Sequence, residues 1–253
     1  MEEGHVICNI DEKGLGTIEF GHPASNALPG NILSKLANTI TETSNDASCK
    51  IILLKSSGDR AFCAGASFDE LIAIQNIEDG KAFFSGFAKV INACRTSSKL
   101  IIGRVHGKAV GGGVGIASAV DYAYATEAAA VKLSELAVGI GPFVVGPAVE
   151  RKVGLSAMSQ LAINATIWRS AKWAEEKGLY ANVYENIEQM DEGIASLVEK
   201  LTSSNPKAME DLKTVFWKGT DHWDTLLSER AEISGRLVLS DFTKNAIQAF
   251  KKN

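Results

Sequence analysis

The stretch Leu100-Ile-Ile-Gly-Arg-Val-His-Gly-Lys-Ala-Val-Gly-Gly-Gly-Val-Gly-Ile-Ala117 decides how the middle of the chain folds. Its β-branched residues predict a buried strand, Gly107 a tight turn, and the small residues from Gly111 onward the start of a helix. Three consecutive glycines let a ligand approach the backbone without meeting a Cβ. The first amides of a helix suit a phosphate or an oxyanion, because they lack intrahelical partners at its positive end. Such a triplet is also typical of a helix packed closely against a strand.

The composition predicts an ordered globular protein. The chain has 253 residues, of which 45% are hydrophobic and 22% charged, so it is long enough to bury a core and too apolar to be disordered. Its net charge of −4 leaves no basic footprint, so we expect no nucleic-acid partner.

The cysteines and the chain start indicate a cytoplasmic protein. The four cysteines show no CxxC spacing and are interpreted as core residues in a reducing compartment: Cys8, Cys49, Cys63 and Cys94. The N-terminus has no apolar signal segment. The longest nearly apolar run, 136–149, is short and rich in Gly and Pro, so no membrane association is expected.

Periodicity along the chain predicts an α/β fold. A body of alternating strands and helices precedes a helical C-terminal third. The expected strands lie at 14–20, 51–55, 101–105, 121–126 and 130–133, and the expected helical stripes at 33–40, 83–94, 194–201, 209–216, 226–239 and 241–250.

Several familiar motifs are absent. The chain contains no Walker loop, and the dinucleotide fingerprint fails because Ile116 or Ser118 stands where the third glycine or alanine belongs. No serine occupies a GxSxG elbow. His106 follows a strand and is interpreted as a structural histidine whose ring nitrogens are satisfied.

Three segments carry a resemblance to a known family. They are Ala61-Phe-Cys-Ala-Gly-Ala66, His106-Gly-Lys-Ala-Val-Gly-Gly-Gly113, and Ser134-Glu135 followed by Gly139-Ile-Gly-Pro142. In order and spacing the chain resembles the crotonase (enoyl-CoA hydratase/isomerase) superfamily. Further similar segments, 22–28, 170–179 and 240–250, extend the resemblance over nearly the whole chain.

The resemblance implies a crotonase-like spiral of ββα units over 1–190 with an acyl-CoA site, and a C-terminal helical trimerisation region over 191–253. It implies a homotrimer or a hexamer built as a dimer of trimers. It also implies a coenzyme A thioester as substrate, with no separate cofactor and no metal.

The resemblance also implies roles for particular residues. The backbone amides of Ala66 and Gly112 would hold the thioester oxygen, and Glu135 would be the acid/base. Two fixed N–H donors stabilise the charge on an enolate oxygen, each contributing on the order of 3 kcal/mol. Substrate contacts are expected from Ala24, Ala64, Gly65, Phe68, Gly111, Gly115 and Pro142.

One position departs from the pattern of the two-glutamate hydratases. Their first glutamate corresponds to Gly115, whereas the second is present as Glu135. Water addition needs several positioned acid and base groups. One carboxylate suffices to move a proton from Cα to Cγ of a 3-enoyl thioester, and the family's isomerases keep only this glutamate. The sequence therefore favours a double-bond isomerase that acts on a 3-enoyl thioester. Dienoyl isomerases keep an additional aspartate eight residues after the glutamate, and Phe143 at that position argues against dienoyl isomerisation.

Three alternatives stay open. The chain also resembles methylglutaconyl-type branched-chain hydratases, for which Asp69 or Glu70 would have to supply a second acid. Decarboxylation of a bound acyl thioester needs the two amides but no base. A non-catalytic CoA-binding scaffold would bind acyl-CoA without turnover.

Candidate contacts for the CoA phosphates, chosen by position only, are Lys55, Lys244 and Lys251.

Overall fold

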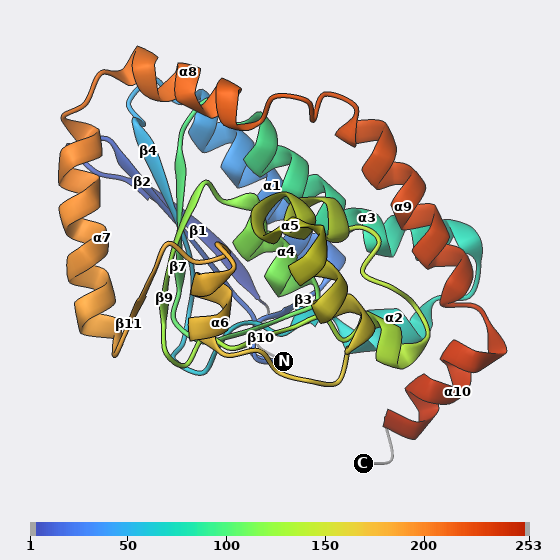
Figure 1. Cartoon of the computed structure of the whole chain (residues 1–253). Helices are drawn as coiled ribbons and strands as arrows, with labels where there is room; N and C mark the ends of the chain where they lie inside the picture. The colour runs from blue at the N-terminus through green and yellow to red at the C-terminus, as the bar shows by residue number, and fades with distance from the viewer. Residues whose placement is uncertain (1–3, 251–253) are drawn as a thin grey trace.

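The computed structural model describes residues 4–250 and shows a sheet layered with helices (Figure 1). The main sheet has the order β1-β2-β4-β7-β9-β11, and every neighbouring pair is parallel except β1 with β2. Its strands are β1 (His5–Ile10), β2 (Leu15–Gly21), β4 (Ile51–Ser56), β7 (Ile101–Val105), β9 (Tyr122–Thr126) and β11 (Asn182–Tyr184).

Short strands continue from the carboxyl ends of the parallel strands. One small sheet has the order β10-β8-β5 and another pairs β3 with β6. Their bounds are β3 (Ala27–Leu28), β5 (Ala61–Cys63), β6 (Gly65–Ala66), β8 (Lys108–Val110) and β10 (Val131–Lys132). The strands β2, β4, β7 and β9 are each followed by one or two of these short strands and then by a helical segment, which confirms the expected ββα spiral.

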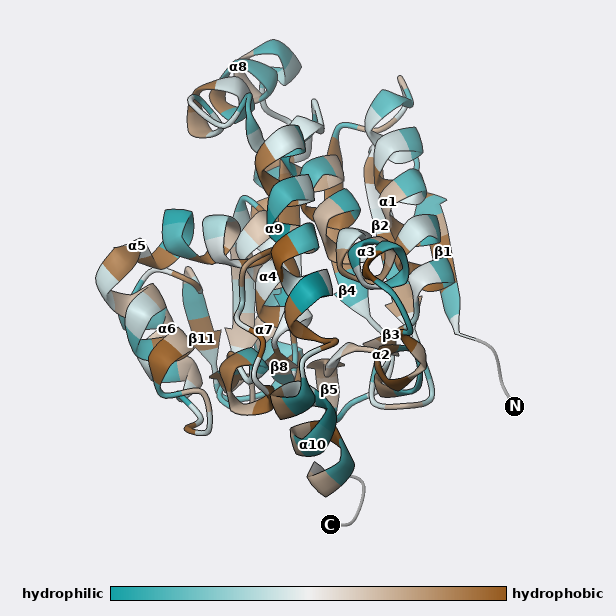
Figure 2. Cartoon of the chain, turned by 90° about the vertical axis from the view of Figure 1, so that its right-hand side faces the viewer, coloured by the Kyte–Doolittle hydropathy of each residue, from teal (hydrophilic) through white to brown (hydrophobic). Residues whose placement is uncertain are grey.

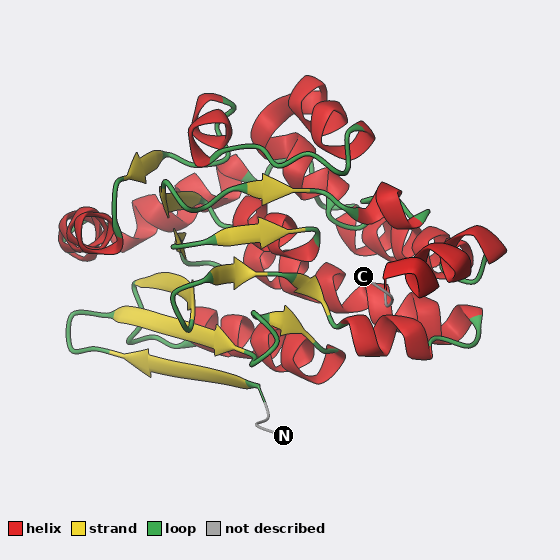
Figure 3. Ribbon diagram, turned by 90° about the horizontal axis from the view of Figure 1, so that it is seen from below, coloured by secondary structure: helices red, strands yellow, loops and turns green. Residues whose placement is uncertain are grey.

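The helices of the spiral pack on one face of the main sheet. They are α1 (Gly30–Asn45), α2 (Phe68–Ala73), α3 (Ile77–Thr96), α4 (Gly112–Ala119), α5 (Gly146–Ile163), interrupted at Gly154, and α6 (Ala171–Glu176). Seen from below, most of the helices lie on one side of the strands (Figure 3).

The C-terminal helices run round the outside of this body. They are α7 (Ile187–Thr202), α8 (Pro206–Phe216), α9 (Trp223–Leu237) and α10 (Asp241–Phe250), drawn orange to red in Figure 1. Helix α7 covers the second face of the sheet, where Met190 and Ile194 pack on Ile51 and Leu53. Because both faces of β4 are covered, its residues 51–54 form a continuous apolar run.

Helix α8 is attached to the core through a buried carboxylate. Lys213 Nζ lies 2.7 Å from Asp121 Oδ2, and Trp217 Nε1 donates to Asp121 Oδ1 at 2.9 Å. The amide of Ile101 donates to the same carboxylate, so the buried charges are paired and hydrogen-bonded. The expected boundary at residue 190 falls inside α7, and the division at 190 stays a prediction. None of the described helices is long and apolar enough to cross a membrane.

Three expectations need correction. Cys8 is exposed on the edge strand β1, while Cys49, Cys63 and Cys94 are buried as predicted. The chain bends at Gly107 as predicted, but strand β8, which was not predicted, lies between this bend and the glycine triplet. The C-terminal third, expected to be helical almost throughout, contains β11, which pairs in parallel with β9.

Candidate active site

A cavity of about 320 Å³ lies where the glycine-rich segment meets the short strands. Its walls are mainly apolar and rich in phenylalanine. Eight of the ten site residues expected from the sequence line it: Ala64, Gly65, Ala66, Phe68, Gly111, Gly112, Glu135 and Pro142. The structure therefore brings together residues from three segments that are far apart in the chain.

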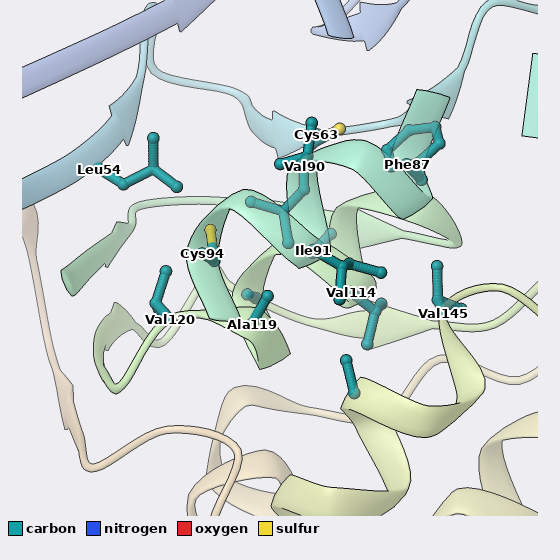
Figure 4. Close-up of a cluster of buried hydrophobic side chains, with 14 of the residues drawn as sticks. Leu54, Cys63, Phe87, Val90, Ile91, Cys94, Val114, Ala119, Val120 and Val145 are labelled. Atoms are coloured by element: carbon teal, nitrogen blue, oxygen red, sulfur yellow. The ribbon is translucent and has the colours of Figure 1, made fainter. Parts of the chain in front are cut away.

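The other two expected residues lie outside the cavity wall. Ala24 is exposed in the turn between β2 and β3, although this turn is close by, because the amide of Ala64 donates to Ser25 O at 3.2 Å. Gly115 is buried inside α4. A Cβ built on Gly115 would lie 2.5 Å from Val145 Cγ1 and 3.7 Å from Ile91 Cδ1. Figure 4 shows Val145 in the cluster of buried side chains that includes Val114 of α4.

The glycines allow the start of α4 to approach the β5–β6 segment. A Cβ on Gly113 would collide with the carbonyl oxygen of Cys63, and a Cβ on Gly65 would lie 3.8 Å from the amide nitrogen of Gly112. Gly111 precedes the helix with φ of +51°, a conformation that favours glycine. Close packing of a helix against a strand, one of the two interpretations of the glycine triplet, is thus present. The same packing brings the backbones of Gly65 and Gly112 close together.

The amide of Gly112 is the first of α4, so it has no carbonyl partner within the helix. It lies at the positive end of the helix dipole and on the wall of an apolar cavity. The ring of Phe87 on α3 packs directly against Gly112, because a Cβ there would collide with it. This contact fixes the position of the backbone at 112.

Glu135 also lies against this helix start. The amide of Gly111 donates to Lys132 O at 2.9 Å, which ties β10 to the beginning of α4. Glu135 then begins the 3-10 turn η1 (Glu135–Val138), and its backbone carbonyl accepts from Ile140 at 3.0 Å. A Cβ on Gly111 would lie 3.0 Å from Glu135 Oε1. The carboxylate therefore stands against the backbone next to the Gly112 amide.

The carboxyl group of Glu135 is poorly solvated. Its Oε2 is buried and has no hydrogen-bond partner among the described residues. Burial raises the pKa of Glu135 from 4.5 to about 7. A carboxylate with a pKa near neutrality, beside an apolar cavity, is suited to take up and return a proton.

Neither candidate for a second acid lines the cavity. Glu70 Oε2 accepts from the amide of Gly30 at 2.9 Å and so caps the start of α1. Asp69 is exposed in the first turn of α2. Among the described residues that line the cavity, Glu135 is the only carboxylate.

A second, polar hollow of about 640 Å³ lies beside the first. Its wall includes His5, His22, Asp59 and Arg60, and it reaches Ala61, three residues before Ala64 of the apolar cavity. Three extended residues span at most about 11 Å, so the two spaces are neighbours.

The expected phosphate-binding lysines lie elsewhere. Lys55 is paired with Glu19 at 2.8 Å, and Lys244 is exposed on α10. Lys251 lies outside the described residues.

Some residues at these sites were not found from the sequence. They are Phe84, Lys132, Ser134, Val145 and Ser234 in the apolar cavity, and Arg60 in the polar hollow. Arg60 directly precedes the Ala61–Ala66 segment, so its position offered a signal. Ser234 on α9 offered none, because only tertiary packing brings this helix to the cavity.

His106 contradicts its interpretation as a satisfied histidine. The side chain is 1% exposed, but neither ring nitrogen has a hydrogen-bond partner among the described residues. Burial, followed by the charge of Arg104, lowers the pKa of His106. It does not line the apolar cavity.

A spiral of ββα units around an apolar cavity is the architecture that the resemblance to the crotonase superfamily implies. The sequence matches the family model for enoyl-CoA hydratase/isomerase over residues 11–252. The chain belongs to this family.

Known relatives and solved structures agree with this assignment. The chain is 29% identical to the short-chain-enoyl-CoA hydratase of Clostridium acetobutylicum, covering 99% of this chain and 95% of that protein. It is 27% identical to the mitochondrial methylglutaconyl-CoA hydratase of Mus musculus, covering 85% and 70%. The crystal structure of enoyl-CoA hydratase from Bacillus halodurans has the same fold, with a TM-score of 0.88 at 20% identity over 96% of this chain and 99% of that one.

Proposed function

We propose that this enzyme isomerises the double bond of an enoyl-CoA thioester with one carboxylate, Glu135. The observation that carries the proposal is that Glu135 is the only carboxylate among the described residues lining the cavity. The space beside Gly115, where a second carboxylate would be attached, is filled by Val145.

The thioester carbonyl oxygen is held by the amides of Ala66 and Gly112. Glu135, as carboxylate, takes a proton from Cα of a 3-enoyl thioester, and the electron pair of that C–H bond moves into the enolate. The negative charge on the enolate oxygen is stabilised by the two amides in an apolar surrounding. Protonated Glu135 then returns the proton to Cγ, the double bond moves to the 2,3-position, and Glu135 is again a carboxylate.

Hydration of a 2-enoyl thioester is the second candidate. The names of the relatives favour it, since the similar proteins from Clostridium acetobutylicum and Mus musculus are both described as hydratases. With one carboxylate, Glu135 would have to deprotonate the attacking water and also supply the proton that Cα receives.

The polar hollow is proposed to take the nucleotide end of coenzyme A. Arg60 offers a guanidinium to a phosphate, and the imidazole of His22 adds a further donor. This assignment replaces Lys55, because that lysine is engaged by Glu19.

A homotrimer or a dimer of trimers is proposed as the working assembly. Large apolar side chains of α5 and the loop that follows it are exposed, which supports a contact between copies. They are Leu155, Ile163, Ile167 and Trp168. The trimerisation role of 191–253 and the cytoplasmic location stay predictions.

The two candidates are separated by assaying the purified protein with a 3-enoyl-CoA and, in parallel, with a 2-enoyl-CoA, and identifying the products by mass and NMR. A 2-enoyl product without a gain of water supports isomerisation. A hydroxyacyl product from the 2-enoyl thioester supports hydration. Tight binding of both thioesters without turnover would move the assignment to a decarboxylase or a non-catalytic scaffold.

A further inference from the structure

One face of α3 runs along the apolar cavity. Gly80, Phe83, Phe84 and Phe87 follow the helical spacing, and all three phenylalanines line the cavity. Phe87 marks the end at which Gly112 lies, since its ring packs against that residue. Gly80 lies seven residues earlier, about 10 Å along the helix axis.

Helix α9 crosses α3 at Gly80. A Cβ on Gly80 would lie 2.8 Å from Gly235 Cα, and a Cβ on Gly235 would lie 2.7 Å from the amide nitrogen of Lys81. The two helices therefore touch backbone to backbone. Figure 2 shows α9 lying alongside α3.

Ser234 directly precedes this crossing. It continues the buried stripe of α9 formed by Leu227 and Ala231, and it is 1% exposed. It is also the one described residue after position 190 that lines the cavity. The small serine side chain therefore forms the wall where α9 meets the cavity.

The position of Ser234 along α3 is fixed by two ion pairs between the helices. Arg95 pairs with Asp224 at 2.8 Å toward one end, and Lys81 pairs with Glu232 at 3.1 Å toward the other. Sliding α9 would break both pairs and the glycine crossing, so Ser234 stays at this end of the cavity.

We propose that Ser234 closes the far end of the acyl cavity and sets the acyl-chain length; this inference rests on the proposed acyl-CoA function. The distance from the Gly112 end to the α9 crossing, about 10 Å, is roughly the extended length of an octanoyl chain. The phenylalanine-rich wall accepts hydrocarbon. The substrate class is thus a medium-length, unbranched enoyl thioester.

The test measures binding, so it does not depend on turnover. Saturated butanoyl-, hexanoyl-, octanoyl- and dodecanoyl-CoA are titrated calorimetrically into the full-length protein and into three variants. Ser234→Leu and Ser234→Val narrow the end of the cavity, and Ser234→Ala keeps it open. Ser228→Leu is the matched control, because Ser228 lies on the same helix but outside the cavity wall.

We expect the unmodified protein to bind octanoyl-CoA more tightly than dodecanoyl-CoA. Ser234→Leu should weaken octanoyl-CoA binding about ten-fold or more and leave butanoyl-CoA within about two-fold, since the larger side chain overfills only the far end of the cavity. Ser234→Val should show the same shift to a smaller extent, and provides the test if Ser234→Leu does not fold. Ser234→Ala and Ser228→Leu should keep the original preference.

An unchanged chain-length preference in both Ser234→Leu and Ser234→Val would overturn the inference while leaving the proposed function intact. Failure of the unmodified protein to bind any of the four thioesters would instead overturn the proposed function, and this inference with it. A preference altered by Ser234→Ala would show that the hydroxyl group, and not the room beside it, selects the substrate, which also contradicts the inference.

Discussion

Val145 occupies the space into which a side chain on Gly115 would extend. Its Cγ1 lies 2.5 Å and its Cβ 2.9 Å from the position of a Cβ on Gly115. Gly115 lies within α4, whereas Val145 directly precedes α5 and is buried. The packing of α4 against the start of α5 therefore leaves no room for a carboxylate side chain at 115. Glu135 remains the only carboxylate among the described residues that line the cavity.

This packing predicts a cost for the smallest possible side chain at 115. Gly115→Ala should lower the free energy of unfolding by about 1–3 kcal/mol, because the new methyl group overpacks the contact with Val145. Shortening the neighbour, as in the double variant Gly115→Ala with Val145→Ala, should recover part of this loss. Urea unfolding of the three proteins measures both effects.

Gly146→Ala is the matched control. Gly146 is also buried and helical, but a Cβ there would meet only the tip of Met158, at 3.4 Å. Its unfolding free energy should stay close to that of the parent or rise slightly. Equal losses for Gly115→Ala and Gly146→Ala would contradict the packing explanation.

The raised pKa of Glu135 predicts a pH-dependent rate. The proton acceptor must be ionised, so kcat/KM for a 3-enoyl thioester should rise with pH and level off above an apparent pKa of about 7. Initial rates between about pH 5 and about pH 9 measure the profile. A rate that is already constant above about pH 5.5 would mean that Glu135 is solvated in the working enzyme.

The same shift predicts an effect of pH on stability. The folded-state pKa of Glu135, about 7, lies above the reference value of 4.5, so its favourable contribution is present below pH 4.5 and is lost as the pH rises through about 7. Glutamine stays neutral. Glu135→Gln should therefore gain up to about 3 kcal/mol over the parent at about pH 8, and much less at about pH 4.5.

Denaturant unfolding at the two pH values measures this gain. The exposed Glu176 supplies the control, and Glu176→Gln should alter the unfolding free energy by less than about 0.5 kcal/mol at either pH. A Glu135→Gln variant that is less stable than the parent at high pH would show that the carboxylate has a partner in the folded protein.

His106 should weaken the fold in acid. Its pKa is lowered by burial, so its contribution to stability is present above about pH 6.5 and is lost as the pH falls from there toward the lowered folded-state value. His106→Phe removes two buried ring nitrogens without partners and should raise the unfolding free energy by about 1 kcal/mol. The variant should also show a smaller loss of stability between about pH 6.5 and about pH 5. Destabilisation at neutral pH would indicate that the imidazole is hydrogen-bonded.

Local patterns in the sequence predicted much of this structure. The stripe of Leu33, Leu36 and Ile40 indicated α1, and the run at 51–54 indicated β4, because each pattern reflects burial on the element's own faces. Strand β1 escaped this method, since it is an edge strand with mostly exposed side chains. Strand β11 has three residues, too few to show a period.

Some features of the candidate site were likewise predictable from the sequence, and others depend on tertiary packing. The proposed backbone donors at 66 and 112 need only small residues, and the spacing of these residues with Glu135 is visible in the sequence. Gly115 lies outside the cavity wall because of how α5 packs, and Ser234 lines the cavity because of how α9 packs. Neither position could be predicted from a local sequence pattern. The missing partners of His106 likewise depend on the arrangement of neighbouring strands, which no local pattern encodes.

The most direct test of proton transfer by Glu135 uses a 3-enoyl-CoA in which deuterium replaces both hydrogens on Cα. The product formed by the purified enzyme is then examined by NMR. Transfer by one carboxylate in a dry cavity predicts a 2-enoyl-CoA with deuterium at Cγ, and Glu135→Gln should lower the rate by several orders of magnitude. A product that carries a hydroxyl group, or a 2-enoyl product with only solvent hydrogen at Cγ, would contradict transfer by Glu135 alone.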